Sequence, residues 1–145
     1  MNDRRHFLKV VGAAGLGCVA AACAEEGTGA SEASGSIAAG NVKDLSVGDL
    51  RQVSGQPVAI GRDEGGVYAM STICTHQQCD MTKDGSIASS GLKCDCHGSS
   101  FDRNGTPTGG PARGVLKHWK VDIANGAITV QAGTAVAADV RVAVT

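Results

Sequence analysis

Short apolar runs separated by turn residues dominate the chain from residue 42 onward. Two pairs of such runs enclose a glycine-containing turn: PVAIG and VYAMST around RDEGG (residues 57–72), and HWKVDI and AITVQ around ANG (residues 118–131). This arrangement predicts two β-hairpins. The alternating VRVAV (residues 140–144) predicts a closing strand, and this region shows no sustained helical periodicity. We therefore expect an all-β domain over residues 42–145, built of small antiparallel sheets.

The N-terminus follows a different pattern. A basic start precedes an apolar run over residues 10–24 with small residues near its end, which is typical of an export signal. Arg4 and Arg5, followed by Phe-Leu-Lys, resemble the twin-arginine signal, by which bacteria export proteins already folded around a cofactor. A membrane span would need about 20 strongly apolar residues. We therefore predict an export leader over residues 1–23, with an ordinary signal or a short anchor helix as alternatives.

Residues 24–41 contain no large apolar side chain except Ile37. Such a segment buries too little surface to offset its ordering entropy, so we expect a flexible linker. Cys23 stands directly before it and resembles the lipidated cysteine of bacterial lipoproteins, although Ala20 occupies the position where leucine is usual. Signal-peptidase cleavage beside Cys23, or an uncleaved leader that anchors the protein, are the alternatives to lipidation.

Composition narrows the classes of function. The chain has 145 residues, a net charge of −1 and only 3% aromatic residues, which gives no support to nucleic-acid binding. The 21 glycines and three prolines fit a turn-rich β fold. A small core without many aromatic residues commonly depends on a metal or a disulfide for stability. We find no nucleophile–base pair, phosphate loop or pair of carboxylates that would indicate a catalytic site of its own.

Four of the six cysteines lie in two boxes, ICTHQQCDM (residues 73–81) and KCDCHGSSF (residues 93–101). Cys94 and Cys96 cannot easily pair, because one intervening residue strains the ring. Two thiolates and two imidazoles could bind either one tetrahedral zinc or a 2Fe-2S centre. In the sequences of zinc sites of this composition, Cys usually lies close to Cys and His close to His. Here each box supplies one metal-binding Cys and one His. This interleaving favours two irons, and the spare cysteines of the two boxes could then pair.

The boxes CTHQQC and CDCHGSSFD, with GGPARGVL downstream, resemble the three cluster loops of the Rieske iron-sulfur proteins. The likeness is to the disulfide-containing kind found in cytochrome bc-type complexes and arsenite oxidase. It implies one 2Fe-2S cluster and the Rieske fold, whose cluster loops form a subdomain at one end. It assigns the metal ligands by position: Cys74, His76, Cys94 and His97. It also implies a Cys79–Cys96 disulfide, and places Pro111 in the loop that covers the cluster.

The resemblance also assigns residues that tune the cluster. Ser99 matches a serine whose hydroxyl bonds a cluster sulfide, but Phe101 stands where high-potential relatives carry a tyrosine that bonds a cysteine sulfur. Hydrogen bonds to sulfur stabilise the added electron and raise the reduction potential. Gln77 and Gln78 replace the Leu-Gly of quinol-oxidising relatives, and Arg113 replaces a proline. We therefore expect a polar tip and a lowered potential.

Three functions fit these features. We favour a one-electron carrier, exported by the twin-arginine route, that is periplasmic or held on the outer face of the cytoplasmic membrane by lipid or leader. Its partners would be a cytochrome or another oxidoreductase subunit. The second is the iron-sulfur subunit of a quinol-oxidising cytochrome bc-type complex or of an arsenite-oxidase-like molybdenum enzyme. The third, a cytoplasmic ferredoxin that serves an oxygenase, is disfavoured by the export signal and the two spare cysteines.

Overall fold

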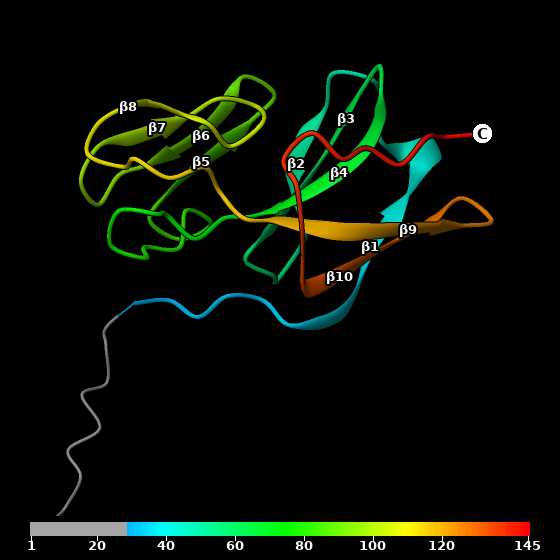
Figure 1. The fold of residues 1–145 in the computed structure, drawn as a ribbon, viewed down its shortest axis with the longest axis horizontal. Helices are drawn as coiled ribbons and strands as arrows, with labels where there is room; N and C mark the ends of the chain where they lie inside the picture. Colours follow the sequence, from blue (N-terminus) through cyan, green and yellow to red (C-terminus); the bar gives the residue numbers. More distant parts are fainter. Residues whose placement is uncertain (1–28) are drawn as a thin grey trace, which may run out of the picture.

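A computed structural model describes residues 29–145, and it consists of two antiparallel β-sheets (Figure 1). The predicted leader, with Arg4, Arg5 and Cys23, lies outside the described residues. The strands are β1 (Gly35–Asn41), β2 (Leu50–Gln52), β3 (Val58–Asp63), β4 (Gly66–Ser71), β5 (Gly85–Ala88), β6 (Gly91–Cys94), β7 (Ser99–Phe101), β8 (Pro107–Gly109), β9 (His118–Ala124) and β10 (Ala127–Val136). Within residues 29–145 the only helical element is a single 3-10 turn, η1 (Val42–Asp44). The predicted all-β class is confirmed.

The larger sheet has the strand order β1-β10-β9-β4-β3-β2. Both predicted hairpins are present in it: β3 pairs with β4 and β9 with β10, each in antiparallel register. β4 also pairs with β9, so the two hairpins join through their inner strands. All six residues of β4 are buried, which explains why its sequence reads as an unbroken apolar run rather than an alternating one.

The predicted linker is shorter than expected, because its second half forms β1. Residues Gly35–Asn41 pair with β10, with Ile37 opposite Val130. Ile37 and Ala39 are buried in the core of the larger sheet, while their neighbours face solvent. Small residues can form such an edge strand, since the backbone ladder supplies the hydrogen bonds and one isoleucine supplies the anchor. The domain therefore begins before residue 42.

The C-terminal segment also differs from the prediction. Residues 140–144 form no strand; only Val142 makes an isolated bridge, to Val67 of β4. The tail is held by Arg141 instead, whose guanidinium donates to the carboxylate of Asp63 at 2.6 Å and to the side chain of Asn104 at 2.8 Å. The same guanidinium lies 4.0 Å from the centre of the Tyr68 ring.

The smaller sheet has the order β5-β6-β7-β8 and lies to one side of the larger sheet (Figure 1). A second apolar core includes residues of both sheets, and these are Leu50, Ala59, Tyr68, Met70, Cys74, Met81, Leu92, Cys94, Phe101, Ala112 and Leu116. Two cysteines from the sequence boxes are therefore core residues. The side chains of Cys74 and Cys94 therefore lie where the two sheets pack together.

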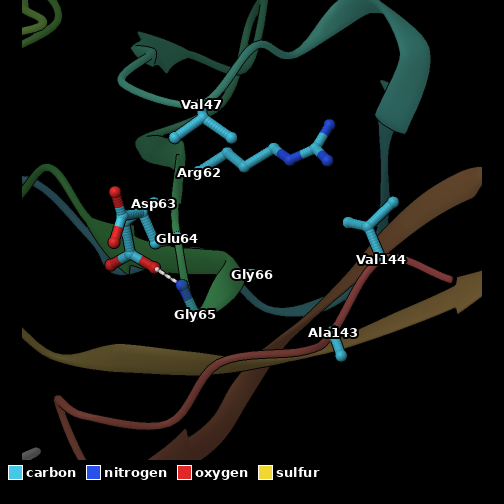
Figure 2. Close-up of a pocket in the computed structure, with 8 residues that line it drawn as sticks. All are labelled: Val47, Arg62, Asp63, Glu64, Gly65, Gly66, Ala143 and Val144. Carbon is cyan, nitrogen blue, oxygen red and sulfur yellow. Dashed lines mark hydrogen bonds between the residues drawn. The ribbon is translucent and has the colours of Figure 1, made fainter.

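A shallow pocket lies between the β3–β4 hairpin and the C-terminal tail, and Figure 2 shows the residues that line it. Gly65 at the hairpin turn donates to the Asp63 carboxylate at 2.9 Å, as in an Asx turn. No residue of the Cys/His boxes lines this pocket. In the described part of the chain, no helix is long and apolar enough to cross a membrane.

Candidate metal centre

The first loop (residues 73–80) leaves β4 and returns toward the smaller sheet. Cys74 is 2% exposed, and its backbone carbonyl accepts from the amide of Gln78 at 2.9 Å. Its amide donates to the carbonyl of Cys79 at 2.8 Å, which closes the loop on itself. Gln78 has a φ of 59°, a left-handed conformation that is rare for residues other than glycine. The turn between these bonds carries His76.

The second loop (residues 95–98) repeats this geometry. It follows Cys94, the last residue of β6, whose carbonyl accepts from the amide of Gly98 at 3.1 Å. Gly98 has a φ of 77°, so it occupies the place that Gln78 occupies in the first loop. Each box therefore folds as a tight turn that begins at a buried cysteine and presents a histidine. Cys94 is 1% exposed.

The two turns bring like groups together. Cys74 and Cys94 lie side by side in the core, and burial, followed by the neighbouring Cys74 side chain, raises the pKa of the Cys94 thiol. The rings of His76 and His97 meet edge to face, with their centres 4.9 Å apart. His97 is exposed and His76 is partly buried. Two thiols therefore lie inward and two imidazoles outward, as the interleaved boxes require.

The Nδ1 atom of His76 is buried and has no hydrogen-bond partner in the described part of the chain. A buried imidazole nitrogen without a partner is costly, and a metal ion bound at that atom would satisfy it. Two buried thiols beside two imidazoles form a mixed sulfur and nitrogen donor set, which suits a soft or borderline metal. The residues present therefore fit a metal group held between the two loops.

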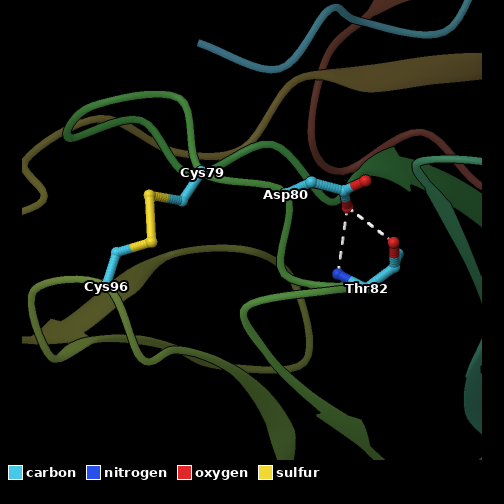
Figure 3. The surroundings of a disulfide bond; sticks show 4 residues. All are labelled: Cys79, Asp80, Thr82 and Cys96. Atoms are coloured by element: carbon cyan, nitrogen blue, oxygen red, sulfur yellow. Dashed lines mark hydrogen bonds between the residues drawn. A yellow bond between two sulfur atoms is a disulfide. The ribbon is translucent and has the colours of Figure 1, made fainter. Parts of the chain in front are cut away.

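A disulfide joins the two loops beside these residues. Cys79 and Cys96 are bonded, with their Cα atoms 6.7 Å apart (Figure 3). The sulfur atom of Cys94 lies within 4.8 Å of both disulfide sulfurs. These three sulfurs do not themselves form a metal site, because disulfide-bonded sulfur is uncharged and only thiolates are strong ligands. Among the described residues, Cys74 and Cys94 are the free cysteines.

A third loop (residues 110–115) covers the second. The hydroxyl oxygen of Ser99, which is fully buried, accepts from the amide of Ala112 at 3.1 Å. Gly110 packs so closely on Gly98 that a Cβ atom would collide with the Gly98 carbonyl. Pro111 lies between these two contacts and is partly buried. Phe101 is buried in the same core as Cys74 and Cys94.

Two features of the site were not found from the sequence. Asp80 is 6% exposed, and its carboxylate accepts from the amide and the hydroxyl of Thr82 at 3.0 and 2.7 Å, which fixes the exit of the first loop (Figure 3). The Asp-x-Thr spacing is a signal that could have indicated this turn. Thr75 donates to the carbonyl of Gly114 at 2.8 Å and so joins the first loop to the third. No sequence signal indicated that contact.

Comparison with known proteins decides the family. The family model for the Rieske [2Fe-2S] domain matches residues 35–120, more than half of the chain. The chain belongs to this family. The metal group of the family is a 2Fe-2S cluster, so the prediction of that group in preference to zinc is confirmed, and the protein is a Rieske electron-transfer protein. The match begins at Gly35, the first residue of β1.

Curated relatives include a cytochrome complex subunit and a dioxygenase ferredoxin. The chain is 32% identical over 96 residues to the cytochrome b6-f complex iron-sulfur subunit of Chlorobaculum tepidum, covering 65% of this chain and 52% of the relative. It is 31% identical over 94 residues to the ferredoxin component of the p-cumate 2,3-dioxygenase system of Pseudomonas putida, covering 62% of this chain and 80% of that protein. The Rieske chain thus spans about half the length of the Chlorobaculum tepidum subunit and most of the length of the Pseudomonas putida ferredoxin.

A solved structure supports the fold. A chain in the complex of reduced oxygenase and oxidized ferredoxin of carbazole 1,9a-dioxygenase aligns with a TM-score of 0.51 at 24% identity, covering 70% of this chain and 96% of that one. At this identity the likeness shows a shared fold and nothing finer. The predicted Rieske-like arrangement of small antiparallel sheets is thereby confirmed.

Proposed function

We propose that Cys74, His76, Cys94 and His97 ligate the Rieske cluster. The observation that carries this assignment is the pairing of two buried thiols beneath two adjacent imidazole rings, with Nδ1 of His76 buried and unpartnered among the described residues. The cluster, when bound, accepts and returns one electron. His97 is exposed and would offer the electron a route from that group to a partner, while the thiols are shielded from water.

We further propose that the protein is an exported electron carrier, which works in the periplasm or on the outer face of the cytoplasmic membrane. The Cys79–Cys96 disulfide supports this location, because such a bond persists where the surroundings are oxidising. The twin-arginine pattern at Arg4 and Arg5 supports it independently. A cytochrome or an oxidoreductase subunit would exchange the electron.

The alternative is a subunit of a larger complex. The cytochrome b6-f relatives favour it, as does the disulfide between the two loops. The loops of this chain, however, carry polar residues on their surface: Gln77, Gln78 and Arg113 are all exposed. An apolar tip would be better suited to docking against a membrane cytochrome, since charged and amide groups lose hydration on burial. The Pseudomonas putida relative is a ferredoxin component of a dioxygenase system, but a ferredoxin that works in the cytoplasm would conflict with the disulfide.

Metal analysis of the purified protein tests the cluster assignment. We expect two irons and two acid-labile sulfides per chain, and an EPR signal with a lower average g value than that of all-cysteine clusters, because neutral imidazole donates less charge than thiolate. His97→Cys serves as a diagnostic variant, since it would shift that signal toward the all-cysteine type if it retains iron. One zinc and no sulfide in the wild type would refute the assignment.

Labelling tests the location. If Cys23 is lipidated, palmitate fed to the cells should enter the protein, and Cys23→Ala should release it from membranes. Replacing Arg4 and Arg5 by lysine should hold the protein in the cytoplasm if the twin-arginine route is used. A mature N-terminus at Glu25 without label would indicate a freely soluble periplasmic protein instead.

A further inference from the structure

Residues 29–34, named here the N-terminal strap, lie against the first loop before the chain enters β1 (Figure 1). The amide of Ala30 donates to the carbonyl of Gln78 at 2.9 Å. Gly29 packs on the same residue, since a Cβ atom there would lie 2.5 Å from Oε1 of Gln78. Ala33 is only 8% exposed and belongs to the core of the larger sheet. The strap is thus fixed at both ends.

A second fastening lies at the entry to the first loop. The carboxylate of Glu32 accepts from the hydroxyl of Ser71, and that hydroxyl oxygen accepts from the amide of Ile73 at 3.0 Å. The ammonium of Lys117 lies 3.3 Å from the other carboxylate oxygen. The strap therefore contacts Ser71, at the end of β4 just before the first loop, and Gln78 within that loop, on the two sides of the turn that carries His76.

The strap contact at Gln78 has a specific physical role. Gln78 is held in the left-handed conformation, which is unfavourable for a residue with a Cβ atom, and its amide closes the turn on the carbonyl of Cys74. The matching turn of the second loop uses Gly98, for which this conformation carries no such penalty. The first loop therefore contains strain that the second lacks, and the strap bond is made to the strained residue.

We propose that the strap is a clip that holds Gln78, and through it Cys74, in the geometry that retains the cluster. The proposal rests on the ligand assignment given above for Cys74. The clip opposes relaxation of the left-handed turn, because opening it would leave the Gln78 carbonyl and the Ala30 amide without their partners. Its expected effect is kinetic: the strap slows loss of the cluster from the first loop.

Proline substitution in the full-length, cluster-loaded protein tests the clip. Ala30→Pro removes the amide that binds Gln78, and it should accelerate loss of the visible absorbance of the cluster on warming by roughly threefold to tenfold, as expected for one backbone hydrogen bond. Ser31→Pro is the matched control, because among the described residues no group accepts from the Ser31 amide. Gly29→Ala should act in the same direction as Ala30→Pro by displacing Gln78.

A double variant separates the clip from a general loosening of the chain. Gln78→Gly removes the conformational strain, so Ala30→Pro in that background should accelerate cluster loss less than twofold. Equal rates for Ala30→Pro, Ser31→Pro and wild type would overturn the clip. So would a full Ala30→Pro effect that persists in the Gln78→Gly protein.

Hydrogen exchange distinguishes failure of the clip from failure of the ligand assignment. In the full-length protein as isolated, Ala30→Pro should speed exchange of the Gln78 and Cys74 amides while leaving that of Gly98 unchanged. Unchanged exchange at Gln78 and Cys74 would overturn the clip whatever metal the protein binds. The wild type could also take up no 2Fe-2S cluster while Ala30→Pro still speeds exchange of the Gln78 amide. That result would refute the ligand assignment, but it would show that the strap stabilises the first loop.

Discussion

Ser99 and Phe101 lie two residues apart on β7, and both side chains are buried on the side of the two free thiols. Ser99 uses its oxygen to accept from the Ala112 amide, which leaves its own proton available to donate. Phe101 has no polar atom, so it contributes packing alone. One of the two hydrogen-bond donors that the resemblance assigns to high-potential relatives is therefore retained and the other is absent.

We predict that Phe101→Tyr raises the reduction potential and Ser99→Ala lowers it. If about half of the free energy of a hydrogen bond to a charged acceptor differs between the oxidised and reduced states, that difference is roughly 1 kcal/mol. For one electron this corresponds to about 40 mV. Ser100→Ala is the control, because Ser100 lies on the opposite face of β7 and is partly exposed. Voltammetry of the four proteins at one pH measures the shifts, and an unchanged Phe101→Tyr potential would mean that residue 101 does not face the cluster.

Sequence spacing pointed to the two boxes because the chemistry of thiols and imidazoles limits what two interleaved boxes can do, and the structure brings their histidine rings and their buried cysteines together. Sequence spacing could not reveal Gln78 as the partner of the strap. A glutamine in an exposed turn looks like ordinary polar surface, and its left-handed backbone is a property of the folded loop. The contact between Ala30 and Gln78 likewise joins segments whose composition carries no signal.

At the level of elements, two tight turns are held together by one covalent bond. The Cys79–Cys96 disulfide spans 17 residues, and closing a loop of this size contributes about 3 kcal/mol in the chain-entropy model. Thr75 and Ser99 join the turns to the third loop by weaker hydrogen bonds. The disulfide should therefore contribute most of the stability of the assembled loops.

We predict that Cys79→Ser and Cys96→Ser each lower the unfolding midpoint by roughly 10–20 °C, since a loss of about 3 kcal/mol is large for a domain of this size. Both variants retain Cys74 and Cys94, so they should still bind iron but lose it sooner on heating. Calorimetry and visible absorbance measure the two effects. The double variant should resemble either single variant, because all three lack the same bond; additive losses would contradict this account.

Local patterns predicted the two hairpins correctly because a glycine-containing turn between apolar runs determines its own pairing. They failed for β1 and for the C-terminal tail for opposite reasons. The first has few apolar residues, yet the free edge of β10 supplies its hydrogen bonds. The tail alternates like a strand, but one bridge at Val142 and the contacts of Arg141 hold it instead. Both outcomes depend on which edge remains available in the complete sheet.

At the level of the whole molecule, a polar group is buried where the two sheets meet. His118 begins β9 and is 2% exposed. Its Nδ1 lies 2.9 Å from the carbonyl of Leu116, and its ring stacks on Tyr68 with centres 6.4 Å apart. Nδ1 therefore carries the proton of the neutral ring. Its Nε2 is buried and has no partner in the described part of the chain.

The pKa of His118 is lowered, chiefly by burial. The bond to Leu116 and the charge of Asp102 act in the opposite direction, while Arg141 lowers the pKa further. In the unfolded chain the imidazole titrates near its ordinary pKa of about 6.5. Between that value and the lowered native value, the unfolded state binds more protons than the folded state. The contribution of His118 to stability is thus complete above about pH 6.5 and is lost as the pH falls through the native pKa.

We predict that His118→Asn reduces the sensitivity of the fold to acid. Asparagine can keep a donor near the Leu116 carbonyl but cannot take up a proton in this range. The unfolding free energy of the wild type should fall between pH 7.5 and 5.5 more steeply than that of the variant, by up to about 1.4 kcal/mol per pH unit for one proton.

Urea unfolding followed by the fluorescence of Trp119, which is the only tryptophan and is buried beside His118, measures both slopes. Parallel slopes would show that the fold tolerates a protonated His118 without loss of stability.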